Sequence, residues 1–214
     1  GMSTHKLPAM LPWVVQRKSF DVVLTVYNFA MGSSMDETIA AVTNAGVGVV
    51  AMKVMAGGFR SLKPSDPIYG KLHRDGAMLA ALKWVLAKPN IATTIPSMTD
   101  MDQLDENLQA MAHPLAPKDE QILARHMEQI RPLYCNMCGE CDGMCKHGLQ
   151  IADTLRVLAY ADGYREFALA RERFHELPPA QIAARCGDCM ECTVQCRHGV
   201  QVQARMSRAQ ELLA

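Results

Sequence analysis

The sequence predicts an α/β fold in which four strand–helix units form a parallel sheet and a mostly helical region follows. Two observations predict it. Short runs rich in β-branched residues alternate with helical patterns over residues 1–130, and all eight cysteines lie beyond residue 130. A chain of 214 residues with 49% hydrophobic content can bury one good core and a small second domain. We therefore expect two domains, 1–130 and 131–214.

The first domain is defined by strands that alternate with helices. The expected strands are GMST at 1–4, SFDVVLTVYNF at 19–29, AGVGVVAMKVMAGG at 45–58 and NIATTIPS at 90–97. The expected helices lie at 34–46, 75–90, 99–112 and 117–130. Ser34 or Asp36 should cap the first of these helices, Gly46 should end it, and Pro89 should end the second. Four such units form half of an eightfold barrel, with any site at the carboxyl ends of the strands.

The cysteines occur in two copies of one pattern, CNMCGECDGMCKHG at 135–148 and CGDCMECTVQCRHG at 186–199. In a reducing compartment this spacing predicts metal binding, not disulfides. CxxCxxCxxxC is typical of [4Fe–4S] centres, and in two-cluster ferredoxins the fourth cysteine ligates the other cluster. The expected ligands of one cluster are Cys135, Cys138, Cys141 and Cys196, and those of the other are Cys186, Cys189, Cys192 and Cys145.

Zinc is the alternative, because it also binds four thiolates. Zinc ribbons use two separated CxxC pairs for each ion, so each copy here has two cysteines too many for that arrangement. Lys146 and Arg197 replace the proline that usually follows the fourth cysteine, which favours a helical scaffold. We expect His147 and His198 near the clusters, where an imidazole N–H or the N–H of the next glycine would donate to a cluster sulfur.

The linker at 149–184 predicts helices, with a break at Gly163 and a stop at Pro178 and Pro179. No alternating strand pattern occurs in it. A domain this small needs its large apolar groups for a core. The aromatic residues expected in that core are Tyr134, Tyr160, Tyr164 and Phe167.

The amino-acid composition argues against nucleic acid as a partner of the chain and against a membrane span. The chain has 22 basic and 22 acidic residues and a formal net charge of zero, which argues against nucleic acid as a partner. No apolar window approaches the roughly 20 residues that a membrane helix needs, and the first residues lack a secretory layout. The sequence thus predicts a cytoplasmic protein.

Several of these segments together resemble a known family. GMSTH, FDVVLTVYNF, GVGVVAMKVMAGG and IPSMTDMDQLDEN are similar, in order, to strands five to eight of the aldo/keto reductase barrel. The subfamily with a C-terminal four-iron ferredoxin domain is the most similar, and the resemblance covers essentially the whole chain. It implies half a TIM barrel followed by an α-helical ferredoxin-like domain. It also implies an NAD(P)-linked oxidoreductase that transfers electrons through two [4Fe–4S] clusters.

The resemblance implies nucleotide contacts at the strand ends. Ser3 and Thr4 would hold the nicotinamide amide, and Glu106 and Asn107 would lie at the adenosine end. The phosphates would meet a loop and the amides at the start of the next helix. The other implied contacts are Asn28, Lys53, Gly57, Gly58, Ser97, Thr99 and Gln103.

Departures from the family leave the choice of NAD or NADP open. Leu24 and Met52 stand where many members have a glutamine and an aromatic residue that pack on the nicotinamide. Ser97 and Gln103 replace the basic residues that bind a 2′-phosphate.

The family's Asp, Tyr, Lys and His tetrad resides on the first four strands, which this sequence does not contain. The catalytic residues therefore stay unassigned, and we expect completion by a redox partner protein or by a missing N-terminal half-barrel. Tyr27 and Lys53 are the pair that could replace the tetrad, and we expect both to serve other purposes. The alternative function is a non-catalytic two-cluster electron-transfer module on a remnant half-barrel. An exposed sheet edge predicts a homodimer through the half-barrel.

Overall fold

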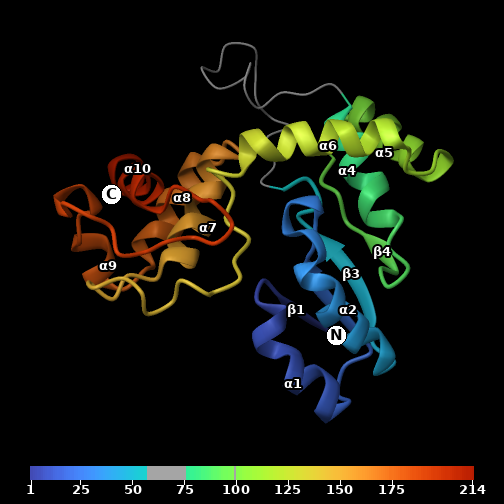
Figure 1. Ribbon diagram of the computed structural model, residues 1–214, viewed down its shortest axis with the longest axis horizontal. Coiled ribbons are helices and arrows are strands. Elements are labelled where there is room, and N and C mark those ends of the chain that lie inside the picture. Colours follow the sequence, from blue (N-terminus) through green and yellow to red (C-terminus); the bar gives the residue numbers. More distant parts are fainter. Residues whose placement is uncertain (57–75, 99) are drawn as a thin grey trace. The chain divides into compact units, whose positions relative to one another are not determined.

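The structure is a computed structural model that describes residues 1–56, 76–98 and 100–214. Three of the expected nucleotide contacts, Gly57, Gly58 and Thr99, lie outside the described residues. The described residues form two compact units, 1–56 with 76–128, and 129–214. Figure 1 shows the strands in the first unit and the red and orange helices of the second.

The first unit contains a four-stranded sheet in the order β1–β2–β3–β4, with every neighbouring pair parallel. The strands are β1 (Met2–Thr4), β2 (Val22–Val26), β3 (Gly48–Met52) and β4 (Thr93–Thr94). One row of the register runs from Ser3 through Leu24 and Val50 to Thr93. Sequential parallel order is compatible with part of a barrel, because barrel strands follow one another in this way. The predicted α/β class and parallel sheet are confirmed.

Helices separate the strands along the chain. They are α1 (Leu7–Arg17), the 3₁₀ segment η1 (Phe29–Met35), α2 (Asp36–Asn44), α4 (Ala77–Leu86), α5 (Met101–Ala112) and α6 (Pro117–Ile130). α1 lies between β1 and β2, α2 between β2 and β3, and α4 between β3 and β4. None of the helices in the described ranges combines the length and hydropathy that crossing a bilayer requires.

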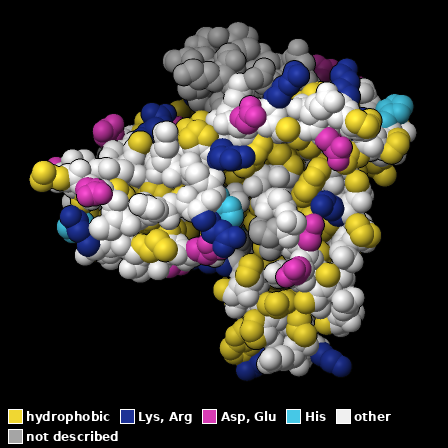
Figure 2. Space-filling view, viewed as in Figure 1, with side chains coloured by type: hydrophobic (Ala, Val, Ile, Leu, Met, Phe, Trp, Pro, Cys, Tyr) yellow, Lys and Arg dark blue, Asp and Glu magenta, His cyan; other side chains and the backbone are white. Residues whose placement is uncertain are grey.

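The sheet has one well-packed face. Alternate strand residues are fully buried, and they form a core with apolar side chains of the helices. Core residues include Val23, Val49, Leu7, Ile39 and Leu82. The opposite face is less covered: Leu24, Val50 and Met52 are half-buried, and Val22 is 42% exposed. Apolar side chains also reach the surface over α1 (Figure 2), where Trp13 is 49% exposed.

The predicted cap of α2 is wrong, whereas its predicted end is confirmed. Met35 occupies the N-cap position without a side-chain cap, because η1 runs directly into the helix and Asp36 already has helical dihedral angles. The Asp36 carboxylate instead accepts hydrogen bonds from Tyr27 and from Lys88. At the other end, Gly46 has a φ of 83°, and its N–H donates to the Thr43 carbonyl at 2.9 Å.

The second unit is helical. Its elements are α7 (Ile151–Asp162), α8 (Phe167–His175), α9 (Pro179–Ala183), the 3₁₀ turn η3 (Cys186–Asp188) and α10 (Val202–Leu213). Residues 129–214 are all described, and none of them forms a strand. Gly163 is the C-cap of α7, so the predicted break is confirmed. α8 ends before Pro178, as predicted. Pro179 is the first residue of the next helix, α9.

The core of the second unit brings α7, α8 and α10 together. Buried members of this core include Leu155, Leu158, Phe174, Met206 and Leu213. Of the aromatic residues expected there, Tyr134 is buried and Tyr160 and Tyr164 are half-buried. Phe167 is 38% exposed, so its prediction is wrong. It is the first residue of α8, beyond the buried part of that helix, and the Arg165 guanidinium lies 5.2 Å from its ring centroid.

Candidate functional site

The eight cysteines lie on two loops of the second unit, one before α7 and one before α10. All eight are described, and none forms a disulfide. Cys138 is exposed and the other seven are half-buried. Six of them pack against the core of the unit, so the helices hold the loops. These six are Cys135, Cys141, Cys145, Cys186, Cys192 and Cys196.

Three thiols of the first loop share a neighbourhood with Cys196 of the second loop. Burial raises the pKa of the Cys135 thiol to about 12, and Cys141, Cys138 and Cys196 raise it further. The Met137 N–H opposes this shift by donating to the Cys135 sulfur at 3.4 Å. Burial also raises the pKa of Cys138 and of Cys141, and Cys196 adds to both shifts. We call these four cysteines the first thiol group.

The second thiol group consists of Cys186, Cys189, Cys192 and Cys145. Burial raises the pKa of Cys186 to about 11, and the other three thiols raise it further. The same four residues line one pocket, together with apolar side chains at the starts of α7 and α10. The fourth cysteine of each loop therefore lies with the first three cysteines of the other loop.

Two glutamines of α10 position the second loop. The Gln210 side chain accepts a hydrogen bond from the Cys186 N–H at 2.9 Å. The Gln203 side chain donates to the carbonyl oxygens of Cys186 and Cys189, at 3.2 and 2.9 Å. The sequence reasoning missed both glutamines, because nothing in the cysteine spacing marks residues on the following helix.

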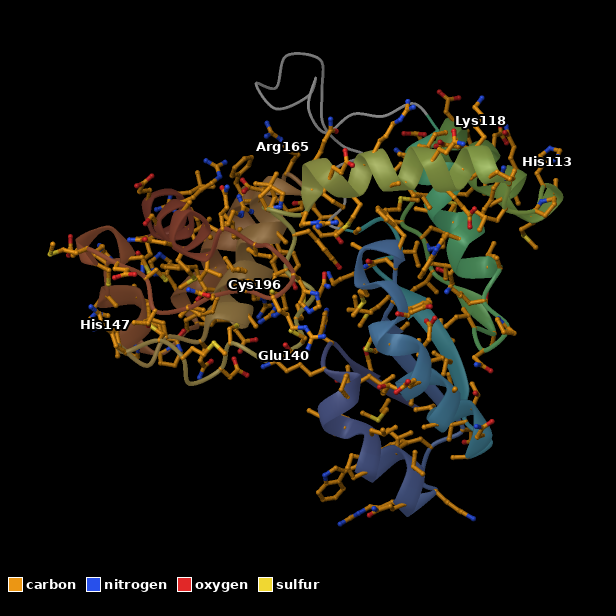
Figure 3. The ribbon with its side chains drawn as sticks, viewed as in Figure 1. His113, Lys118, Glu140, His147, Arg165 and Cys196 are labelled. Atoms are coloured by element: carbon orange, nitrogen blue, oxygen red, sulfur yellow. The ribbon has the colours of Figure 1, made fainter. Side chains whose placement is uncertain are left out.

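The two loops also contact each other directly. The Arg197 guanidinium donates to the Glu140 carboxylate at 2.9 Å, and the Thr193 hydroxyl donates to the Met144 carbonyl at 2.9 Å. Both contacts join a residue of the first loop to a residue of the second. Figure 3 labels Glu140 on the first loop and Cys196 on the second.

The His-Gly pair ends each loop in the same turn. Gly148 and Gly199 have φ values of 69° and 86°, and their N–H groups donate to the carbonyl oxygens of Cys145 and Cys196 at 2.9 and 3.0 Å. In this left-handed turn each glycine N–H donates to a carbonyl oxygen, whereas the expected donation to a cluster sulfur stays a prediction. Burial lowers the pKa of His198, Arg197 lowers it further, and Glu140 opposes this shift.

The distances between the thiol sulfurs distinguish a site for one zinc ion from a site for a [4Fe–4S] cluster. Among the eight sulfurs, all of which are described, no three lie within 4.8 Å of one another. Four sulfurs around one zinc ion, at Zn–S distances of about 2.3 Å, would lie only about 3.8 Å apart. Each thiol group is therefore wider than a mononuclear zinc centre. Four cysteines per group are the donor set that a [4Fe–4S] cluster takes.

The first unit brings several predicted nucleotide contacts to one edge of its sheet. Thr4, Asn28, Lys53 and Ser97 lie at or beyond the carboxyl ends of β1, β2, β3 and β4, and parallel strands place these ends together. Ser3 is an exposed residue of β1. The remaining described contacts, Gln103, Glu106 and Asn107, are in α5.

Asn28 joins the ends of two strands. It is fully buried, its side chain donates to the Lys53 carbonyl at 2.9 Å, and it accepts from the Ala30 N–H at 3.1 Å. Lys53 has a φ of 55°, an uncommon conformation for a residue with a side chain. The contact therefore shapes the site edge at β2 and β3.

The start of α5 carries negative charge. Asp100 is its N-cap, and its carboxylate accepts from the Gln103 N–H at 2.8 Å and from the Gln103 side chain at 2.7 Å. Asp102 follows in the first turn. Both carboxylates would repel a phosphate at this helix start. This repulsion argues against the expected binding of a cofactor phosphate by the N–H groups at the start of α5.

Tyr27 does not pair with Lys53. Its ring is buried, and its hydroxyl donates to the Asp36 carboxylate. Burial raises the pKa of Tyr27, and the Asp36 carboxylate raises it further. Tyr27 thus holds its proton tightly near neutral pH, unlike a tyrosine that a lysine activates as an acid.

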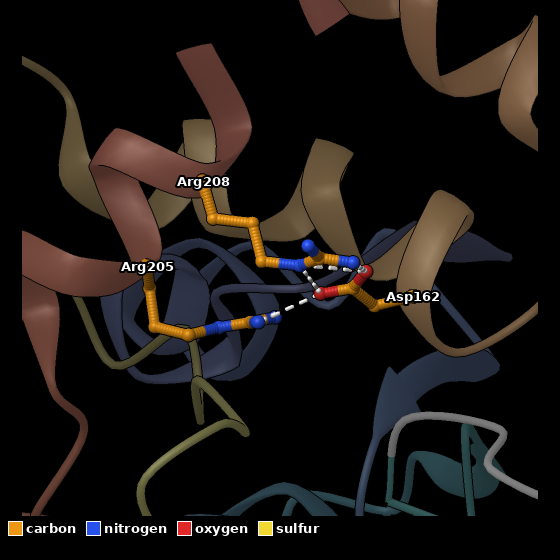
Figure 4. A network of polar contacts seen from close by, with 3 residues as sticks. All are labelled: Asp162, Arg205 and Arg208. Atoms are coloured by element: carbon orange, nitrogen blue, oxygen red, sulfur yellow. Dashed lines mark hydrogen bonds and ion pairs between the residues drawn. The ribbon is translucent and has the colours of Figure 1, made fainter. Parts of the chain in front are cut away.

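Sequence reasoning also missed a partly buried ionic cluster that joins α7 to α10 (Figure 4). The Asp162 carboxylate accepts from Arg205 at 2.7 Å and from two nitrogens of Arg208, the shorter contact being 2.7 Å. The Asp162 and Arg205 side chains are 7% and 10% exposed. Charged residues at these positions resemble ordinary surface residues in the sequence, so no local pattern marks them.

The fold and the thiol groups define a parallel α/β protein with a thiol-rich helical unit. Residues 68–128 match the aldo/keto reductase family, so this part of the chain is similar to that family. The match includes α4, β4 and α5. No curated protein matches the chain. The family match indicates an oxidoreductase, and members of the family usually bind NAD(P).

Proposed function

We propose that the chain is an iron–sulfur oxidoreductase of the aldo/keto reductase type. Two [4Fe–4S] clusters in a ferredoxin-like second unit would exchange single electrons with a nicotinamide-linked site on the first unit, which would be half of a TIM barrel. The observation that carries the proposal is the exchange of fourth cysteines between the loops, with Cys196 beside the first loop's thiols and Cys145 beside the second's. This is the ligand arrangement of two-cluster ferredoxins.

The residues of the second unit fit this role in two ways. Each thiol group has four cysteines, and its sulfurs are spaced more widely than zinc requires. The backbone N–H groups of Met137 and Glu140 donate to the sulfurs of Cys135 and Cys138. When bound, the clusters would supply one-electron transfer, and hydrogen bonds to the ligand sulfurs are among the factors that set their potentials.

The metal content of anaerobically purified chain tests this proposal. We expect about eight iron and about eight acid-labile sulfide per chain, with a broad visible absorbance that dithionite bleaches. The measurement combines elemental analysis for iron and zinc with a sulfide assay. Zinc without sulfide, after strictly anaerobic work, would show that the thiols serve a structural metal and would overturn the cluster assignment.

The first unit is proposed to bind the nicotinamide cofactor at the carboxyl ends of its strands. Lys53 follows β3 there, its backbone carbonyl accepts a hydrogen bond from Asn28, and its side chain is cationic. Lys53→Ala should weaken NAD(P)H binding about tenfold or more, because a hydrogen bond to a charged group contributes about 1.5–3 kcal/mol. Fluorescence titration would measure the Kd.

Lys18→Ala is the matched control for Lys53→Ala. Lys18 also has a positive φ, 49°, but it follows α1 and precedes β2, at the other end of the sheet. The control should bind like wild type. Equal loss in both variants, or no binding by the unchanged chain, would contradict the nucleotide site.

The pairing of Tyr27 with Asp36 favours a second candidate function. Tyr27 keeps its proton in a hydrogen bond to Asp36, so this tyrosine is not one that a lysine activates as an acid for carbonyl reduction. The chain would then be a non-catalytic two-cluster electron-transfer module. Full cluster content together with no nucleotide binding would support this candidate over the oxidoreductase.

The less covered face of the sheet is proposed to associate with a second copy of the chain. It exposes Val22 and the half-buried Leu24, Val50 and Met52. Sedimentation velocity at micromolar concentration should show a dimer, and Val22→Asp should convert it to a monomer. A monomer in both cases would remove this proposal. Other partners of that face would be a redox protein or an N-terminal half-barrel.

A further inference from the structure

Three metal-binding side chains from the two loops converge at the edge of the first thiol group. The Cys138 sulfur, a Glu140 carboxylate oxygen and a ring nitrogen of His198 all lie within 4.8 Å of one another. Within the described ranges, no other three histidine, cysteine or acidic side chains come as close. Cys138 and Glu140 are exposed and His198 is half-buried, so an ion in solution can reach the site.

The three donors suit a divalent ion of the zinc class. Zinc takes thiolate sulfur at about 2.3 Å and imidazole nitrogen or carboxylate oxygen at about 2.0–2.2 Å, usually with four ligands. Three protein ligands leave the fourth position to water. The Arg197 guanidinium donates to one oxygen of Glu140 at 2.9 Å, which holds the carboxylate at the edge of the site.

The second loop pattern supplies an internal comparison. Cys189, Glu191 and His147 occupy the matching positions of the repeat, and all three line the pocket of the second thiol group. Their ligand atoms do not come within 4.8 Å of one another in the described structure. Of the two matching sets, only Cys138, Glu140 and His198 therefore converge in the described structure.

We propose that Cys138, Glu140 and His198 bind one divalent ion of the zinc class while the first thiol group holds no cluster. Because Cys138 belongs to both sites, the ion and the first cluster exclude each other. The exclusion rests on the proposed iron–sulfur function, whereas the ion binding does not. Bound zinc would thus occupy the exposed Cys138 thiol and block the assembly of the first cluster.

Cobalt(II) is the probe for binding to the reduced, cluster-free chain. We expect one site whose sulfur-to-metal absorption has the intensity of a single thiolate, with paramagnetically shifted proton signals from one imidazole ring. Glu140→Gln and His198→Asn should each weaken that site about tenfold or more, because losing even a residue that only hydrogen-bonds a metal ligand typically costs about 10–100-fold in affinity. His198→Asn should also remove the imidazole signal.

The matched controls are Glu191→Gln and His147→Asn, which should leave affinity and spectrum within about twofold of wild type. The far-ultraviolet circular dichroism of each variant checks its fold. Equal affinity in all four variants, or absorption that corresponds only to four thiolates per ion, would overturn the site.

Reconstitution separates this inference from the proposed function. Wild-type chain loaded first with one zinc should take up about four fewer iron than untreated wild-type chain. The His198→Asn variant, treated with zinc in the same way, should take up as much iron as untreated chain. No iron uptake by untreated chain would count against the clusters and leave the cobalt result standing. Full uptake by zinc-loaded wild type would overturn the mutual exclusion.

Discussion

Replacing Cys196 by alanine is expected to remove the first of the two proposed clusters and to leave the second, so that the chain holds about four iron instead of about eight. Cys196 belongs to the second loop by sequence, but its thiol raises the pKa of Cys135, Cys138 and Cys141 of the first loop. Iron and sulfide analysis, with electron paramagnetic resonance of the reduced chain, would measure the loss. Cys145→Ala is the matched variant, and it should remove the other cluster.

Double variants distinguish exchanged ligands from unexchanged ones. If the fourth cysteines are exchanged, Cys135→Ala with Cys196→Ala damages one cluster and should leave about four iron, whereas Cys135→Ala with Cys145→Ala damages both and should leave almost none. If each loop held its own cluster, these two results would be reversed. Both double variants lose two thiols, so a general effect on folding would not produce the difference.

Replacing Asp162 by alanine is expected to lower the free energy of unfolding by about 3–5 kcal/mol. The Arg205 side chain is 10% exposed and donates to Asp162 at 2.7 Å, so the change leaves a buried guanidinium without its carboxylate. Urea denaturation followed by circular dichroism would measure the loss. The affected contact joins α7 to α10, the helices that follow the two cysteine loops.

Glu176→Ala is the matched control for Asp162→Ala. Glu176 and Arg173 also pair at 2.7 Å, but their side chains are 53% and 45% exposed. Exposed ion pairs contribute little, because water and salt screen them. This variant should unfold like wild type. A similar loss in both variants would show that burial does not determine the effect of Asp162.

The same carboxylate should make stability depend on acid pH. Burial opposes the ionisation of Asp162, but hydrogen bonds from Arg208 and the charge of Arg205 outweigh it and lower its pKa. The folded pKa is therefore below the unfolded value of about 3.9. The stabilisation is full above that value and is lost as pH falls through the folded pKa. Asp162→Asn should remove this part of the acid dependence, and an unchanged acid slope would contradict it.

Much of the fold could be predicted because its signals are local. The apolar runs around Val23 and Val49 predicted strands, and both residues are buried in the parallel sheet. Gly46 and Gly163 predicted helix ends, because a glycine beyond the last turn interrupts the helical pattern. Predictions failed where the environment overrides the local pattern. Asp36 pairs with Tyr27 and Lys88 instead of capping α2, and Phe167 lies outside the core.

The sequence by itself determined the donor chemistry of this protein: eight thiols in two equal loops, each loop followed by a His-Gly turn. Only the tertiary structure decided which side chains meet. The packing of α7 against α10 joins Asp162 to Arg205, and the contact between the loops brings His198 beside Cys138 and Glu140. These partners are far apart along the chain. Residue spacing describes a single helix or loop, whereas contacts between elements depend on how their buried faces fit together.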